Sequence, residues 1–324
     1  MSKVFLYFLG AGASCQVLPL AADFSMRLKA FTPGLQYAGY DDAEIGKALI
    51  TSQGFKWGEI HQRLYEDFEW LASESSHHFS IDTLAKKLFF KGDLKNLKRL
   101  KAILSVYLLI EQSKSNADQR YDAFLASIME LDENRRIRLP KQLRILTWNY
   151  DTQLEKAFYG FCENIEHTLE NITFNNDAIY RINGYCGTPE PGHIGGAFRD
   201  FLNSKNSPTW ETGVQLYSEY VKSSNVPDIN FAWEDQTQTK LKNRLSAILA
   251  DVTDIVVIGY SFPYFNREVD DLIFSQLSHL NNIYLQMPDK AQTSITDRIE
   301  KLLPPHDKIV PITSTDLFFI PDDF

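Results

Sequence analysis

The stretch that decides the fold is Val4-Phe5-Leu6-Tyr7-Phe8-Leu9-Gly10-Ala11-Gly12-Ala13-Ser14. Its first six residues are apolar on both faces of an extended chain, which is typical of a buried parallel strand. The glycines at positions 10 and 12 permit a tight turn and a close approach of a ligand to the backbone. If a helix begins directly beyond, its free N–H groups favour a phosphate here. The third glycine of the complete dinucleotide motif is absent, so the turn alone is equally consistent with one that binds nothing.

Further apolar runs predict more strands of the same parallel sheet. They are Leu143 to Thr147, Asp254 to Ile258, Ile283 to Gln286 and Ile309 to Ile312. Apolar residues recur at helical spacing in 42–50, 57–72, 81–112 and 117–132.

These patterns predict an α/β fold with a Rossmann-like, doubly wound parallel sheet and an inserted helical subdomain. We expect the core over residues 1–35 and 140–324 and the helical insertion over 36–139. A second insertion, over 187–245, is rich in loop-forming residues before a helix expected over 236–249.

The overall charge is acidic, with 33 basic and 42 acidic residues and a formal net charge of −9. This balance argues against a general attraction to nucleic acids or to anionic membranes. One local basic cluster stands out, and its simplest interpretation is a solvated helix face. It consists of Lys86, Lys87, Lys91, Lys95, Lys98, Arg99 and Lys101.

The cysteines Cys15, Cys162 and Cys186 form no C-x-x-C pair. This argues against a zinc ribbon and against a disulfide scaffold, and it suits a reducing compartment. The amino-terminal residues lack the layout of a signal peptide, and no apolar run reaches the roughly 20 residues of a membrane span. We therefore expect a cytoplasmic protein that does not enter a membrane.

Small and polar residues follow several of the predicted strands. After two of these strands they form Thr147-Trp148-Asn149-Tyr150-Asp151 and Gly259-Tyr260-Ser261, and a similar segment, Ile179-Tyr180-Arg181-Ile182-Asn183-Gly184, follows a polar, hairpin-like stretch. Because the carboxyl ends of parallel strands share one edge of a sheet, these segments are expected to converge with the glycine turn.

Each of these segments also has a purely structural interpretation. Asn149 and Asp151 are equally suited to cap a helix that begins near residue 152. Tyr260 is equally suited to packing, and Asp270 and Asp271 beside Arg267 to a surface ion cluster.

The motifs and their order resemble the sirtuin-like (silent information regulator 2 type) family, and in particular its bacterial NAD-consuming branch in antiphage defence. Residues 10–14 followed by Leu18-Pro19 resemble the family's G-A-G-x-S with a small apolar residue and proline. Residues 147–151 resemble T-x-N-Y-D, and residues 259–261 resemble the late G-Y-S. The resemblance covers residues 1–30 and 140–320, whereas the helical insertion is only vaguely similar.

The resemblance implies an NAD site at the sheet edge. In this interpretation the pyrophosphate lies on Gly10, Ala11, Gly12, Ala13 and Ser14. Ser261 and nearby backbone bind the adenosine half, Asn149 lies at the nicotinamide ribose, and Asp151 helps to place the nicotinamide amide. The remaining candidate NAD-binding residues are Pro19, Thr147, Trp148, Gly184, Gly259 and Tyr260.

Two departures from the family pattern matter. Three scattered cysteines cannot supply the four-cysteine zinc module of the protein deacylases, so we expect no zinc or other metal and disfavour deacylation. The family's His-Gly pair, whose histidine is the general base, falls at Asn183-Gly184. Asn183 can hydrogen-bond ribose hydroxyls but cannot accept a proton. His167 and His193 in flanking loops are the candidates to replace that base.

These observations favour a cytoplasmic NAD glycohydrolase that releases nicotinamide and ADP-ribose as the effector of a bacterial defence system. Unregulated cleavage of NAD would kill the host, so we expect the activity to be held off by assembly into a homo-oligomer or by a separate partner, such as an ATPase or a phage-sensing protein. This step rests on analogy.

Asn183 favours the alternative of a weak or inactive NAD- or ADP-ribose-binding sensor or scaffold. An ordinary dinucleotide oxidoreductase is disfavoured, because the acidic residues about 20 positions or more beyond the glycine turn, Asp41 and Asp42, lie in loop-like sequence.

Overall fold

The computed structural model describes residues 3–37, 51, 53–162, 178–187, 209–222, 227–234, 239–303 and 308–324. The chain divides into two compact units, each assembled from separate stretches of sequence. The first unit contains residues 1–16, 117–184 and 230–324, and the second contains residues 17–116 and 185–229. The sheet edge that carries the predicted motifs belongs to the first unit.

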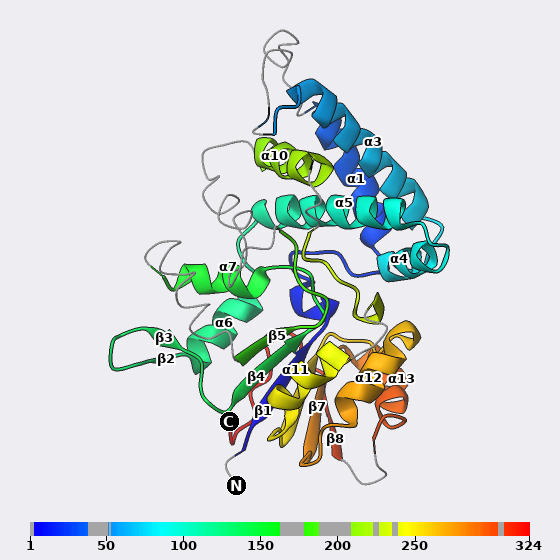
Figure 1. The fold of residues 1–324 in the computed structure, drawn as a ribbon. Coiled ribbons are helices and arrows are strands. Elements are labelled where there is room, and N and C mark those ends of the chain that lie inside the picture. The colour runs from blue at the N-terminus through cyan, green and yellow to red at the C-terminus, as the bar shows by residue number, and fades with distance from the viewer. Residues whose placement is uncertain are drawn as a thin grey trace. The chain divides into compact units, whose positions relative to one another are not determined.

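The first unit is built on a six-stranded parallel sheet with the order β5-β4-β1-β6-β7-β8 (Figure 1). The strands are β1 (Phe5–Leu9), β4 (Leu143–Thr147), β5 (Ile179–Arg181), β6 (Asp254–Ile258), β7 (Asn282–Gln286) and β8 (Lys308–Ile312). Central β1 pairs with β4 and β6, so that Phe5 aligns with Leu143 and with Asp254. This arrangement confirms the predicted α/β class, and its strand order is that of Rossmann-like folds.

Helices flank both faces of this sheet. Leu6 and Phe8 of β1 point into a core that includes residues of α11 (Thr239–Leu249) and α12 (Arg267–Phe274). Tyr7 points to the other face, where its ring lies 4.6 Å from that of Phe124 on α6 (Gln119–Ile128). The alternation along β1 thus explains why every residue of this strand is apolar.

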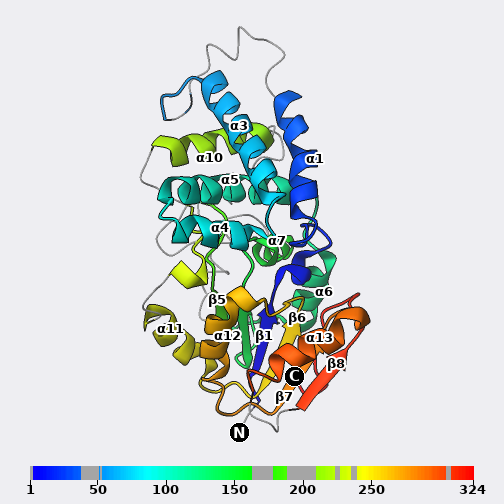
Figure 2. The same cartoon turned by 90° about the vertical axis from the view of Figure 1, so that its right-hand side faces the viewer.

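The remaining helices of the first unit are short. Figure 2 shows α13 (Asp289–Ile299) beside β7 and β8, and Gln292 of α13 donates to the carbonyls of Leu285 and Met287, both at 3.0 Å. Helix α7 (Gln153–Gly160) packs on α6.

Two parts of the first unit were not predicted. β5 is a three-residue strand, half exposed at the sheet edge, and therefore lacks the apolar run that marks the other strands. The helix predicted over 117–132 ends at Ile128, and an exposed hairpin follows, with β2 (Glu130–Leu131) paired to β3 (Ile137–Arg138). Helix α6, expected within the insertion over 36–139, belongs to the first unit.

The described part of the second unit is helical. It contains α1 (Phe24–Tyr37), α3 (Trp57–Ser75), α4 (Ile81–Phe90), α5 (Leu94–Ser113) and α10 (Thr209–Lys222). Helix α1 packs on α3, α4 on α5, and α10 on both α3 and α5. Asp67 of α3 ties three helices together, because it accepts hydrogen bonds from Arg99 of α5 at 2.6 Å and from Tyr217 of α10.

The helical pattern over 81–112 corresponds to two helices, α4 and α5, and not to one continuous helix. The chain turns at Gly92, whose φ of +68° suits glycine, and Asp93 then caps α5 by accepting a hydrogen bond from the N–H of Asn96 at 3.2 Å. The loop-rich interval 187–245 contains α10, which was not predicted. The helix predicted over 42–50 lies outside the described residues. In the described part of the chain, no helix has the length and apolar character needed to cross a membrane.

Candidate functional site

The predicted motifs of the first unit lie at one edge of its sheet. β1, β4, β5 and β6 are parallel, so the segments that follow them meet at the carboxyl ends of the strands. These segments are residues 10–14, 148–151, 182–184 and 259–261. The strand order reverses direction between β1 and β6, and open α/β sheets bind ligands at this switch point.

The turn after β1 and the turn after β6 pack directly against each other. A Cβ atom added at Gly10 would lie 2.5 Å from the Cα of Tyr260, and one added at Gly12 would lie 2.6 Å from the Cα of Gly259. The N–H of Gly12 donates to the carbonyl of Gly259 at 3.0 Å. Gly259 itself has a φ of +63°, which favours glycine. This packing requires the glycines whether or not a ligand is bound.

A single 3-10 turn, η1 (Ala11–Ser14), follows β1 in place of an α-helix, and the next helix begins only at Phe24. Arg120 binds the carbonyl side of this turn, because its Nη2 donates to the carbonyls of Gly12 and Ala13, both at 3.1 Å. The α-helical N-terminus considered for phosphate binding does not follow the turn directly.

A buried ion pair holds Arg120 in place. Asp118 accepts from the Nε of Arg120 at 2.9 Å and from its Nη2 at 2.5 Å. Asp118 also accepts from the N–H of Gln16 at 3.2 Å, and its own N–H donates to Gln153 at 2.8 Å. This ion pair was not predicted from the sequence. Its only sequence signal is an aspartate at a helix start, and nothing there connects it to a turn about a hundred residues earlier.

Asn149 joins the end of β4 to the glycine turn. Its Nδ2 donates to the carbonyl of Gly10 at 3.0 Å and to the Oγ of Ser14 at 3.3 Å. The backbone N–H of Asn149 donates to the Oγ1 of Thr147 at 3.0 Å. Because the Gly10 carbonyl can only accept a hydrogen bond, the side-chain amide of Asn149 must direct its NH₂ group, and not its oxygen, toward Gly10. The Oδ1 of Asn149 has no hydrogen-bond partner among the residues that the structure describes.

Asp151 lies buried next to the same serine. Burial raises the pKa of Asp151 above its usual range, and this effect outweighs hydrogen bonds from the Gln153 N–H and from Ser14 and the positive charge of Arg181. Ser14 is 3.3 Å from the hydroxyl of Tyr121. Asp151 thus caps the first turn of α7, as the structural interpretation expected, and also belongs to a buried polar cluster beneath the glycine turn.

Asn183 is buried, and both atoms of its amide are engaged. Its Nδ2 donates to the carbonyl of Trp148 at 3.0 Å, and its Oδ1 accepts from the N–H of Ala232 at 3.0 Å. The following residue, Gly184, has a φ of +69°, which permits the turn after β5. Asn183 therefore clamps the end of β4 to the segment before α11.

Tyr260 is a packing residue, in agreement with its structural interpretation. Its ring stacks on that of Trp148 with centroids 5.1 Å apart, and its hydroxyl donates to Asp270 at 3.0 Å. The indole Nε1 of Trp148 is buried without a hydrogen-bond partner in the described part of the chain. Asp270 is buried, so the surface ion cluster predicted as an alternative was wrong for this residue, whereas Asp271 does pair with Arg267 at the surface. Burial raises the pKa of Asp270 to about 8, although its bond from Tyr260 and the charge of Arg267 oppose this.

Ser261 is exposed at the end of the β6 turn. Its carbonyl and that of Phe262 accept hydrogen bonds from Arg298 at 2.7 and 3.5 Å. Phe262 has a φ of +48°, which is unfavourable for a residue with a side chain, yet its ring is buried against Phe8. Arg298 and the aromatic core together hold this strained segment in place.

The other candidates lie elsewhere. Pro19 belongs to the second unit, and His167 and His193 lie outside the described residues. Cys15 is exposed and Cys186 is buried. Across the residues that the structure describes, no three His, Cys, Asp or Glu side chains are grouped so that they could hold a metal ion.

Neither a protein-family model nor a curated protein matches this sequence.

Proposed function

We propose that the first unit binds NAD at the carboxyl edge of β1, β4 and β6 and cleaves it to nicotinamide and ADP-ribose. The sirtuin-like resemblance of the three motifs at this edge is the source of the proposal. The strand order supports it, since dinucleotides bind at the switch point of Rossmann-like sheets. The turn after β1 lies at that point, with Asn149 and Asp151 beside it.

The observation that carries the proposal is the orientation of Asn149. Its NH₂ group is held by Gly10 and Ser14, which leaves Oδ1 as an acceptor without a partner in the described part of the chain. Cleavage of the nicotinamide–ribose bond passes through an oxocarbenium-like state and needs a water molecule in the right position. An amide oxygen fixed from behind is suited to accept a hydrogen bond from that water or from a ribose hydroxyl.

Hydrolysis adds water across the bond. The water oxygen bonds to the ribose carbon, the bonding electron pair leaves with nicotinamide, and one proton is released to solvent. Nicotinamide is positively charged in NAD and becomes neutral on leaving, so the reaction requires little help at the leaving group. A slow reaction without a dedicated base is consistent with this chemistry, because general-base catalysis typically contributes 10²–10⁴-fold.

Asn183 favours a second candidate function, the binding of NAD or ADP-ribose without turnover. The position that resembles the family's general base holds an amide, and both of its atoms are bonded to the backbone of the same unit. Such a protein would act as a sensor or scaffold. In either form we propose a cytoplasmic role in bacterial antiphage defence, restrained by self-assembly or by a separate partner, and this part rests on the resemblance alone.

The test is to incubate the full chain with NAD and measure nicotinamide release by chromatography and NAD binding by calorimetry. We expect Asn149→Ala to lower release by about 10²-fold or more. Asn134→Ala, an exposed asparagine on the β2–β3 hairpin, is the matched control and should leave release unchanged. Binding without release, alone and with an added partner protein, would exclude the hydrolase and leave the sensor. Absence of both binding and release would exclude both functions.

A further inference from the structure

A cavity of about 430 Å³ lies wholly within the second unit. The first turn of α1 and the α3–α4 connection form its walls, with Ala22, Ser25, Lys29, His78 and Phe79 among the lining residues. None of the side chains that line it is acidic. Its volume is within the range of pockets that hold a ligand or a large side chain.

Large apolar side chains are exposed around this cavity and along α4. Phe79 at the cavity is 81% exposed, and Phe90 at the end of α4 is 76% exposed. Met26, which lines the cavity, and Leu94, at the start of α5, are exposed as well. Large apolar side chains that stay exposed beside a cavity are typical of a surface that binds something.

Lysines accompany these apolar side chains. The Nζ of Lys87 lies 3.1 Å from the Nε2 of His78, whose Nδ1 is 2.8 Å from the carbonyl of Glu74. Because that carbonyl can only accept, Nδ1 carries the proton and Nε2 accepts from the ammonium group of Lys87. The imidazole therefore fixes a positive charge beside the cavity, which Lys29 also lines.

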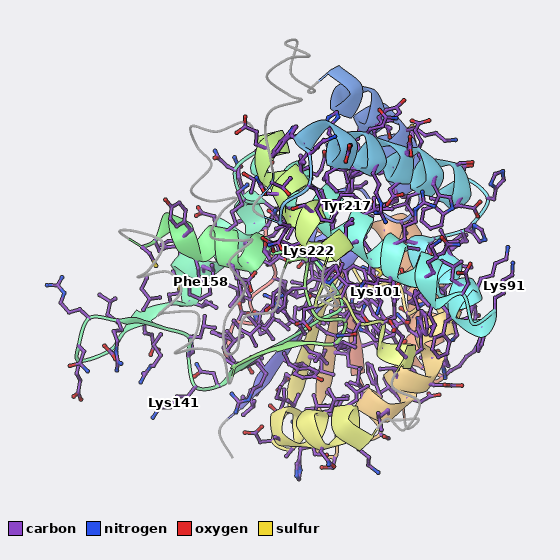
Figure 3. The ribbon with its side chains drawn as sticks, turned by 45° about the horizontal axis from the view of Figure 1, so that its top comes forward. Lys91, Lys101, Lys141, Phe158, Tyr217 and Lys222 are labelled. Atoms are coloured by element: carbon purple, nitrogen blue, oxygen red, sulfur yellow. The ribbon has the colours of Figure 1, made fainter. Side chains whose placement is uncertain are left out.

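The positive charge continues along α4. Lys86 lies 5.9 Å from the ring of Phe90, and Figure 3 shows Lys91 at the end of α4 with its side chain directed outward. Lys29 and Lys91 form no ion pair among the residues that the structure describes. The nearby carboxylate of Asp93 is engaged in capping α5. The basic residues of α1 and α4 outnumber the single acidic residue of these two helices, Asp82, although the chain as a whole has a net charge of −9.

We propose that this face, formed by Met26, Lys29, Phe79, Lys87, Phe90 and Lys91, binds an acidic segment of a partner protein that inserts one bulky apolar side chain into the cavity. The lysines supply charge complementarity to acidic residues on either side of the inserted side chain. A buried apolar anchor in a pocket is the usual source of affinity in such interfaces. A membrane surface or a nucleic acid would use the exposed rings and lysines but would leave the cavity empty. The proposal goes beyond the NAD site and does not depend on it.

The experiment selects binders for the full chain from a library of random ten-residue peptides. We expect peptides rich in Asp and Glu around one Trp, Phe or Leu. Their binding, measured by fluorescence anisotropy, should weaken at least tenfold in Ala22→Trp, which fills the cavity, and at least tenfold in Lys87→Glu combined with Lys91→Glu. Lys141→Glu, which removes an exposed lysine of the first unit (Figure 3), is the control and should leave binding unchanged.

Other outcomes would overturn the proposal. One is a selection that yields no binders, or binders without acidic residues. Another is peptide binding that survives Ala22→Trp. A third is binding of a single-stranded DNA oligonucleotide or of phosphatidylserine vesicles that depends on Lys87 and Lys91 when no acidic peptide competes. Thermal unfolding of each variant verifies that it is folded.

Discussion

At the scale of single residues, the two asparagines at the sheet edge behave differently. Asn149 is fixed through its NH₂ group and keeps its oxygen without a partner in the described residues. Asn183 has its oxygen and nitrogen bonded to Ala232 and Trp148. A buried amide with both atoms engaged acts primarily as a structural clamp. The question of catalysis therefore depends on Asn149, whereas Asn183 first of all stabilises the fold.

Two substitutions of Asn183 test its structural role and a catalytic role separately. Asn183→Ala leaves the Trp148 carbonyl and the Ala232 N–H without their partners, and we expect the free energy of unfolding to fall by about 2–4 kcal/mol. Urea denaturation measures this loss. Asn183→His introduces the base that sirtuin-like proteins have at the position resembled by Asn183, and the proposed function predicts that it raises nicotinamide release, at some cost in stability. A stability unchanged by Asn183→Ala would contradict the clamp.

At the scale of elements, two turns rather than a helix build the candidate site. The turn after β1 and the turn after β6 approach so closely that their glycines have no room for a Cβ atom. Arg120 of α6, held by Asp118, binds the carbonyl side of the first turn. Contacts within the unit thus hold the loop in this conformation without a ligand, which favours preorganised binding.

Alanine substitutions test this packing. In Gly12→Ala the new Cβ would meet backbone atoms of the facing turn, and we expect a loss of about 1–3 kcal/mol or more. Gly160→Ala, at the end of α7, is the matched control, because outside the backbone of α7 its new Cβ would have as nearest neighbour the Oδ1 of Asp122, 3.8 Å away. The control should be neutral or gain up to about 1 kcal/mol. Thermal unfolding of both variants provides the comparison, and equal stability of the two would refute the turn packing.

At the scale of the whole molecule, stability depends on carboxyl groups that the fold buries. Asp151 and Asp270 both have pKa values raised by burial, and that of Asp270 is about 8. A carboxyl group with a higher pKa in the folded than in the unfolded state binds more protons when folded. Its ionisation therefore destabilises the folded state as the pH rises from the pKa of the group in the unfolded state to its pKa in the folded state.

The free energy of unfolding should accordingly fall from about pH 4 to about pH 8 on account of Asp270. Asp270→Asn keeps a polar group at this position but cannot ionise, so it should flatten part of this dependence. Asp271→Asn is the control, because Asp271 is exposed and pairs with Arg267 at the surface. Urea denaturation at several pH values makes the comparison, and a slope unchanged by Asp270→Asn would contradict the assignment.

The local sequence was sufficient to predict the central strands and the edge of the sheet at which the motifs lie. Apolar runs such as Val4 to Leu9 are buried on both faces, so their pattern alone indicates a parallel sheet. β5 escaped prediction because an edge strand of three half-exposed residues has no such pattern, and the α4–α5 break depends on a single glycine with a positive φ.

Only the tertiary structure decided what the motif residues do. Hydrogen bonds join residues far apart in the chain, such as Arg120 to Gly12 and Asn183 to Ala232, and no local pattern encodes such pairs. The same holds for the cavity in the second unit. The lysines of α4 lie beside a cavity and exposed apolar side chains only because α1, α3 and α4 pack together. Local periodicity determined the central strands and most of the described helices, and long-range packing determined which side chains and backbone groups meet at the sheet edge.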